Sequence, residues 1–221
     1  SERVGAMVLE SGVNVVSNDY QTSGTNTSVL FFNEGNNFAN SLVRTQGAVV
    51  RFRAIDGTLG INTKGRIQIG PSNTTNPAGQ LLKNGILAEG GVGGFAVVGD
   101  DWATISADLV AGGNFDTSVT ALTTYQTSAV PADWAATDNV KLSTPGTVAL
   151  SSVATVNSLI LGDQVDLNLG GSQLIVDAGG ILALSTTTAK TIGNGSLTGG
   201  AFAASEIVLR TASDAGTGQA V

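Results

Sequence analysis

The residues best suited to chemistry are four basic side chains, Arg51, Arg53, Lys64 and Arg66. Arg51 and Arg53 are two residues apart, so on a β-strand both project from the same side, away from Val50 and Phe52. A polysaccharide lyase would need such a base opposite calcium-binding carboxylates, and no Asp/Glu cluster follows at the spacing of successive strands. We interpret this basic stripe as a solvated outer face, or as a contact for an acidic glycan or an acidic neighbouring subunit.

Composition excludes most other active sites. The 221 residues contain no histidine and no cysteine, which rules out Ser-His-Asp triads, Cys-His dyads, zinc fingers and disulfide frameworks. Asp100-Asp101 matches the paired aspartates of galacturonases, but the histidine motif of those enzymes cannot exist here. We therefore interpret this pair as turn residues, and we predict no enzyme, no cofactor and no metal site.

Two further groups of residues suggest binding, each with a structural alternative. Asp163, Asp166 and Asp177 lie in successive segments and could approach one another around calcium, or they could occupy separate turns. Trp102 and Trp134 each follow an aspartate. Their rings could stack on sugars in a glycan contact, or they could fill the core beneath a long loop.

The net charge of −7 argues against a nucleic-acid partner, which needs a basic footprint. Residues 1–83 carry seven basic and five acidic residues, or +2, whereas residues 84–221 carry three and twelve, or −9. This uneven division favours head-to-tail association of like subunits. No apolar run reaches the roughly 18 residues of a membrane span. Without an initiator Met or a leader, we expect a mature or excised piece of a longer exported protein.

Internal repetition predicts two diverged copies, residues 1–106 and 107–221, which could form one continuous solenoid. Both tyrosines, Tyr20 and Tyr125, open the string YQTS. Three further pairs of segments follow in the same order: NSL at 40–42 and 157–159, Asp56–Ile69 with Gly171–Leu184, and Asn84–Val98 with Asn194–Leu209.

Short strands separated by glycine-rich turns run through both copies. Val165–Leu169 alternates apolar and polar residues, which is typical of a strand with one buried side. The turns recur so that three strands make a circuit of about 24 residues, as in a parallel β-solenoid. Small residues at the corners would let successive circuits stack closely.

Thr155–Gly200 contains an NSL strand, a V-x-L strand, G-x-L-x-V-x-x-GGIL and a G-x-L-x-GG turn. In these motifs the chain resembles the autotransporter-associated β-strand repeat family of planctomycete-type exported, passenger-like β-helix proteins. The resemblance covers residues 133–209 and extends more faintly over 40–109. It implies an all-β, right-handed parallel β-helix outside the cell or on a bacterial surface, and it carries over no catalytic or ligand-binding residue.

We therefore expect a structural extracellular protein, a repeat unit of a surface fibre, stalk or matrix. It would self-associate with like subunits through β-strand or end-to-end contacts, because the chain ends within the strand pattern. The candidate association residues near that end are Glu206, Ile207, Val208 and Leu209. The alternatives are an adhesin passenger domain that binds a polysaccharide and, more remotely, a polysaccharide lyase.

Overall fold

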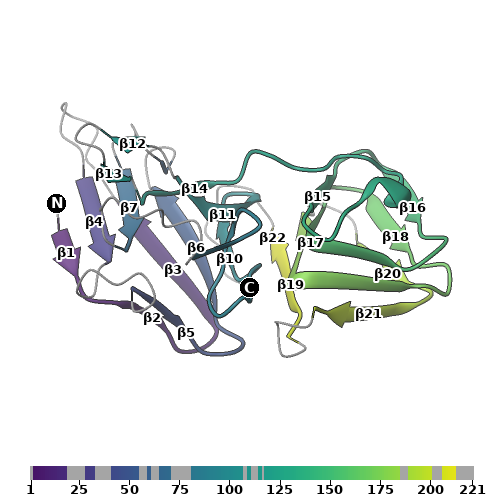
Figure 1. The fold of residues 1–221 in the computed structure, drawn as a ribbon, viewed down its shortest axis with the longest axis horizontal. Coiled ribbons are helices and arrows are strands. Elements are labelled where there is room, and N and C mark those ends of the chain that lie inside the picture. Colours follow the sequence, from purple (N-terminus) through teal and green to yellow (C-terminus); the bar gives the residue numbers. More distant parts are fainter. Residues whose placement is uncertain are drawn as a thin grey trace. The chain divides into compact units, whose positions relative to one another are not determined.

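The protein is described by a computed structural model, shown in Figure 1. It describes residues 2–18, 28–32, 41–54, 59–60, 65–70, 81–106, 109–110, 114–115, 117–184, 189–200 and 206–212. Strands dominate this part of the chain, with a short 3₁₀ helix, η2, at Pro131–Asp133. The predicted all-β class is confirmed. The chain divides into two compact units, Ser1–Thr123 (unit 1) and Thr124–Val221 (unit 2).

In unit 1 the chain passes through three sheets in turn and then returns to the first. The first sheet holds β1 (Glu2–Val4), β4 (Ser28–Phe32) and β7 (Gly65–Ile69), and the second holds β2 (Met7–Leu9) and β5 (Leu42–Arg44). The third holds β3 (Val13–Asn18), β6 (Val49–Ala54), β10 (Ala96–Val98), β11 (Asp101–Ile105) and β14 (Val119–Ala121). Pairing is parallel except at β11 and β14. Each circuit, meaning one passage through the three sheets, thus adds parallel strands to the stack (Figure 1).

Two antiparallel hairpins also belong to unit 1. They are formed by β8 (Leu82–Lys83) with β9 (Ile86–Leu87), and by β12 (Leu109–Val110) with β13 (Asn114–Phe115). The first turns at Asn84-Gly85, where both residues have positive φ angles of 46° and 90°. An Asn-Gly pair in this conformation is the usual two-residue connection of a hairpin.

Unit 2 also stacks parallel strands along three lines. The strands are β15 (Asn139–Leu142), β16 (Gly146–Ala149), β17 (Ala154–Leu161), β18 (Val165–Asn168), β19 (Gln173–Leu184), β20 (Ile192–Gly193), β21 (Ser196–Gly199) and β22 (Val208–Ala212). The first part of β19 pairs with β21 and its second part with β22, so β19 contributes to two lines. Asn139, Ser158, Gly180 and Val208 are successive partners. They lie 19, 22 and 28 residues apart, close to the expected circuit of about 24.

Small residues at the corners let circuits approach, as expected. A Cβ atom added at Gly162 would lie 2.7 Å from the carbonyl oxygen of Leu142 in the preceding circuit. Real Cβ atoms do not come so close to backbone, so the corner requires glycine. The interior between the strand lines is filled by buried aliphatic side chains, including Leu159, Leu167 and Leu174.

The two compact units meet between residues 123 and 124, whereas the predicted sequence copies divide between residues 106 and 107. β14 pairs with β11, with Ala121 opposite Ala103, so this strand belongs to unit 1. The charge division shifts with it. Unit 1 carries seven basic and ten acidic residues, or −3, and unit 2 carries three and seven, or −4. The +2 and −9 segments therefore divide within the β8–β9 hairpin and do not correspond to structural units.

The relationship between the two copies stays a prediction. Ser41-Leu42 and Ser158-Leu159, from the two NSL strings, are buried alike, the first pair at the start of β5 and the second within β17. In contrast, Asn84–Val98 begins with β9, the second strand of an antiparallel hairpin, whereas Asn194–Leu209 begins with the parallel strand β21. Tyr20 and Asn40 lie outside the described residues.

Candidate functional site

The first circuit of unit 2 is partly covered by the segment that precedes it. Gln126 forms a parallel bridge to Val140. Its N–H donates to the Asn139 carbonyl at 2.9 Å, and its own carbonyl accepts from the Lys141 N–H at 2.9 Å. The Lys141 ammonium lies 5.2 Å from the centre of the Tyr125 ring. The strand edge of β15 is therefore partly satisfied within the chain.

Trp134 fills the core at the same end. Its side chain belongs to the buried cluster of unit 2 and is 9% exposed. The indole Nε1 donates to the Ser128 carbonyl at 2.8 Å, and the Ser128 hydroxyl donates to the Asp133 carboxylate at 2.6 Å. The second YQTS string, Tyr125–Ser128, thus takes part in closing the end of unit 2.

The last circuit of unit 2 ends differently. Among the described strands, β20, β21 and β22 each pair on one side only. Val140, Leu159, Ile181 and Leu209 form one ladder, and the first three are fully buried. Leu209, the last member, is 65% exposed. An interior position is thus left open to solvent at this end.

A cavity of about 520 Å³ lies at this open end. Aliphatic side chains from several strands line it, among them Leu161, Ile181, Leu197 and Leu209. No aromatic side chain is among the described lining residues, so the cavity lacks a ring face on which a sugar could stack. Its chemistry suits aliphatic groups.

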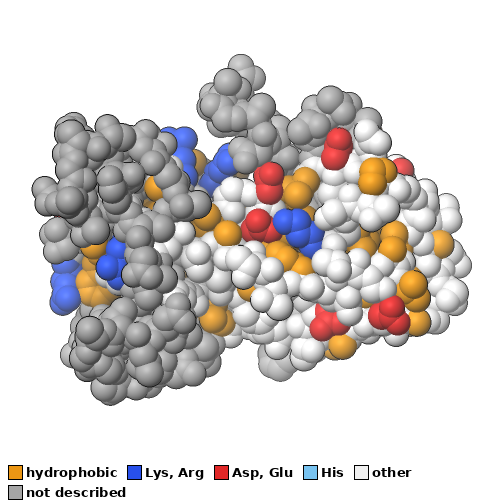
Figure 2. All heavy atoms as spheres, turned by 90° about the horizontal axis from the view of Figure 1, so that it is seen from above, with side chains coloured by type: hydrophobic (Ala, Val, Ile, Leu, Met, Phe, Trp, Pro, Cys, Tyr) orange, Lys and Arg blue, Asp and Glu red, His pale blue; other side chains and the backbone are white. Residues whose placement is uncertain are grey.

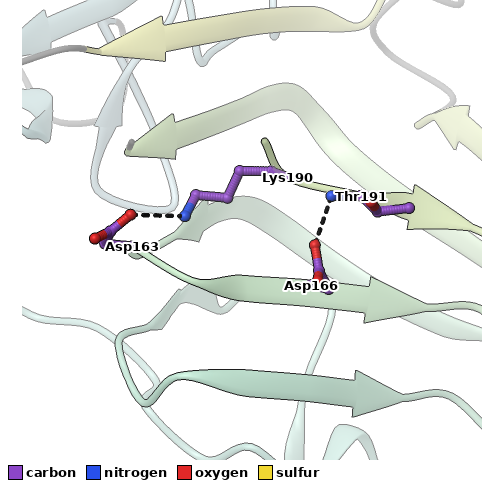
Figure 3. A network of polar contacts seen from close by, with 4 residues as sticks. All are labelled: Asp163, Asp166, Lys190 and Thr191. Carbon is purple, nitrogen blue, oxygen red and sulfur yellow. Dashed lines mark hydrogen bonds and ion pairs between the residues drawn. The ribbon is translucent and has the colours of Figure 1, made fainter. Parts of the chain in front are cut away.

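Lys190 brings a cation into this cavity. The Lys190 side chain is 8% exposed, and its Nζ lies 3.5 Å from a carboxylate oxygen of Asp163. The Asp163 side chain is 40% exposed. Figure 3 shows the pair beside a second contact, in which the Thr191 N–H donates to Asp166 at 2.7 Å. Asp163 and Asp166 thus have different partners. Within the described residues, no group of three acidic or metal-ligating side chains could hold a metal ion.

The predicted association residues lie at this open end. Ile207 and Leu209 line the cavity, Val208 is the buried first residue of β22, and Glu206 is half-buried. Lys190 and Leu197 were missed from the sequence. Leu197 stands opposite Leu174 in a parallel ladder, a pairing that only the structure supplies, and a lysine after a threonine-rich stretch resembles an ordinary solvated residue.

The basic stripe is only partly assembled. Arg51 is half-buried and Arg53 exposed on β6, opposite the buried Val50 and Phe52, as the alternation predicts. The Arg53 Nε donates to the Ser17 hydroxyl at 2.8 Å.

Two members expected in the same stripe are placed otherwise. Arg66 lies on β7, which belongs to a different sheet from β6, and its Nε donates to the Ser118 hydroxyl at 3.4 Å. Lys64 lies outside the described residues. The two described strands therefore do not align their arginines along one sheet face.

Neither tryptophan offers a ring to a sugar. Trp102 on β11 is fully buried, and Trp134 is nearly so. Ring stacking on a glycan needs an exposed face, so the sugar-stacking prediction for Trp102 and Trp134 is wrong. Their burial agrees with the alternative, in which both rings fill the core. Asp100 lies in the turn between β10 and β11, and Asp101 is the first residue of β11.

Comparisons with protein-family models, with curated proteins and with solved structures each found no match. The expected family therefore stays a prediction. In the described part of the chain, no helix has the length and apolar character needed to cross a membrane. On the face drawn in Figure 2, the described charged side chains are few and stand among neutral atoms.

Proposed function

We propose that this chain is a structural protein that associates with like subunits through the open end of unit 2. Its stacked strand lines would be those of a right-handed parallel β-helix, and the chain would serve as a repeat unit of an extracellular fibre, stalk or matrix without enzymatic activity. The observation that carries the proposal is the exposure of Leu209 at the end of an otherwise buried ladder.

Two physical terms favour association at this end. The outer edges of β20, β21 and β22 offer backbone groups for pairing with another chain. Burying an exposed leucine contributes about 1.5–3 kcal/mol, and Leu209 is accompanied by half-buried Leu197 and Ile207 at the cavity. The low content of charged residues, 12%, leaves little repulsion between neighbouring copies.

The proposed extracellular location rests on composition and on the motifs in Thr155–Gly200. A cysteine-free chain rich in small neutral residues is compatible with an exported bacterial protein. The strand stacking agrees with the architecture that those motifs imply.

Sedimentation velocity of the full chain over a concentration series tests the proposal. We expect the wild type to form species larger than the monomer as concentration rises. Leu209→Glu should remain monomeric, because a carboxylate would enter an apolar interface. Val153→Glu is the matched control, since Val153 is 59% exposed and is not among the cavity residues.

The control variant should associate like the wild type. A wild type that is monomeric at every concentration would overturn the proposal. Equal loss of association in both variants would show that the open end has no special role.

A second function, binding of an anionic polysaccharide, is favoured by the exposed guanidinium of Arg53 beside Arg51 on β6. The Arg51→Glu/Arg53→Glu double variant should then lose binding to acidic glycans on an array while retaining its fold. Unchanged binding would remove this alternative.

A further inference from the structure

We propose that the partner at the open end of unit 2 is the first circuit of unit 1 in a second copy. This inference rests on the proposed self-association and names its two surfaces. β1 of the incoming copy would continue the line of β20, β2 that of β21, and β3 that of β22. Each junction would add one parallel strand to each line.

The strand order of the two circuits corresponds, and so does the spacing of their first two strands, whereas the third strand follows after residues 10–12 in unit 1 and after residues 200–207 in unit 2. β20 and β21 are separated by the two residues Asn194-Gly195, and β1 and β2 are separated by the two residues Gly5-Ala6. In both circuits two short strands come first and the longest strand comes last, with five residues in β22 and six in β3. A second copy therefore presents short, short and long edges in the order that the open end offers them.

The first circuit of unit 1 also has edges available for pairing. Among the described strands, β1 pairs only with β4, β2 only with β5 and β3 only with β6. All three pairings are parallel, as are those of the last circuit of unit 2. Parallel pairing would thus continue unchanged across the junction.

The side chains at the two edges are complementary in type. Glu2 and Val4 stand in register with Leu30 and Phe32, which pair with the buried Ile67 and Ile69. Glu2 and Val4 therefore lie on the interior side of β1. At the other surface, Lys190 and Leu197 line the cavity.

This arrangement would place Val4 against an aliphatic wall. It would also bring the exposed Glu2 carboxylate toward the sparsely solvated Lys190 ammonium. Local complementarity of this kind does not depend on the total charge of each unit.

The closed end of unit 2 determines what kind of assembly results. Gln126 pairs with β15 and Trp134 fills the core at the first circuit of unit 2. Among the described strands only β16 of that circuit pairs with the next circuit alone, so this end does not offer the three strand edges that the first circuit of unit 1 offers. Joining two different surfaces is a heterologous contact. Such contacts form rings or open filaments rather than two-fold dimers.

Disulfide trapping tests this geometry cleanly, because the chain contains no cysteine. Two single-cysteine variants, Glu2→Cys and Ile192→Cys, are mixed and oxidised at a concentration where the wild type associates. Using separate chains excludes a link within one molecule. The matched control mixes Glu2→Cys with Val153→Cys, which is exposed but outside the open end.

We expect the Glu2→Cys and Ile192→Cys mixture to give at least about fivefold more covalent heterodimer than the control mixture. Equal yields while the wild type still associates would overturn this inference but leave the proposed function standing. A wild type that does not associate would overturn both.

Charge reversal gives an independent readout. Glu2→Lys and Lys190→Glu should each weaken association by about three- to tenfold, and the double variant should regain most of the loss. Additive weakening in the double variant would contradict the pairing of these two surfaces. The cavity could instead take up a small aliphatic molecule. Monomers would then bind a fluorescent fatty acid saturably and form no covalent heterodimers, and this result would also overturn the inference.

Discussion

The two ends of unit 2 are built from the same kind of strand, yet one is closed and the other is open. At the first circuit, Gln126 pairs with the β15 edge and Trp134 covers the interior. At the last circuit, Leu209 remains exposed above a cavity. The comparison shows that stacked strands do not protect their own ends, and that a covering segment must supply an aromatic plug and backbone partners.

The largest effect should come from removing the plug at the closed end. Trp134→Ala should lower the free energy of unfolding of unit 2 by about 3–5 kcal/mol, because a buried ring and its Nε1 hydrogen bond are lost together. Urea unfolding followed by far-ultraviolet circular dichroism measures this. Trp134→Phe, which keeps a ring, should lose clearly less, and equal losses would contradict a plugging role.

A pair of leucines in one ladder compares the interior with the open end. Leu159→Ala should cost about 2–5 kcal/mol, since Leu159 is fully buried. Leu209→Ala should cost less than about 1 kcal/mol in the monomer, since most of that side chain is already in water. Denaturation at a concentration low enough to keep the chain monomeric gives both values. Similar costs would mean that the last circuit is covered in solution.

Two glycines compare a closely packed corner with a loosely packed strand end. Gly162→Ala should cost about 1–3 kcal/mol, because the new Cβ would meet the Leu142 carbonyl of the first circuit. Gly193→Ala in the last circuit should change stability by less than about 0.5 kcal/mol, since its Cβ would make only an ordinary contact with Thr191. A thermal unfolding series ranks the two variants, and the reverse ranking would contradict the stacking described for these corners.

The smallest effect is expected at the ion pair beside the cavity. Lys190→Met keeps the apolar stem and removes the charge. The free energy of unfolding should fall by less than about 1 kcal/mol, because the Asp163 carboxylate is well exposed and lies 3.5 Å from the Lys190 Nζ. Asp163→Asn is the matched change on the other partner. Chemical denaturation at low and high salt measures the free energy of unfolding of both variants. A loss of several kcal/mol in either variant would contradict this prediction.

Much of this architecture was predictable from spacing, because short strands recur at the interval of a stacked circuit. The alternation at Val165–Leu169 is confirmed by burial of Val165, Leu167 and Leu169. The unit boundary was not predictable, since the antiparallel pairing of β14 with β11 depends on a distant partner rather than on local residue pattern.

The candidate site was predicted only in part. Glu206 to Leu209 stood out as candidate association residues near the end of the chain; the structure begins β22 at Val208 and places Ile207 and Leu209 at the cavity. The low exposure of Lys190 arises from neighbouring circuits, which a charged residue in a loop does not reveal. For Trp134, sequence alone left sugar stacking and core packing as alternatives, and burial decides between them.

Hydrogen exchange of the full chain at increasing protein concentration tests the central claim most directly, because it reports both ends of unit 2 in one sample. We predict that backbone amides of β22 and β21 gain protection as concentration rises, whereas those of β15 stay unchanged. Equal change at both ends, or no change in β22 at concentrations where larger species form, would contradict the claim that the open end is the association surface.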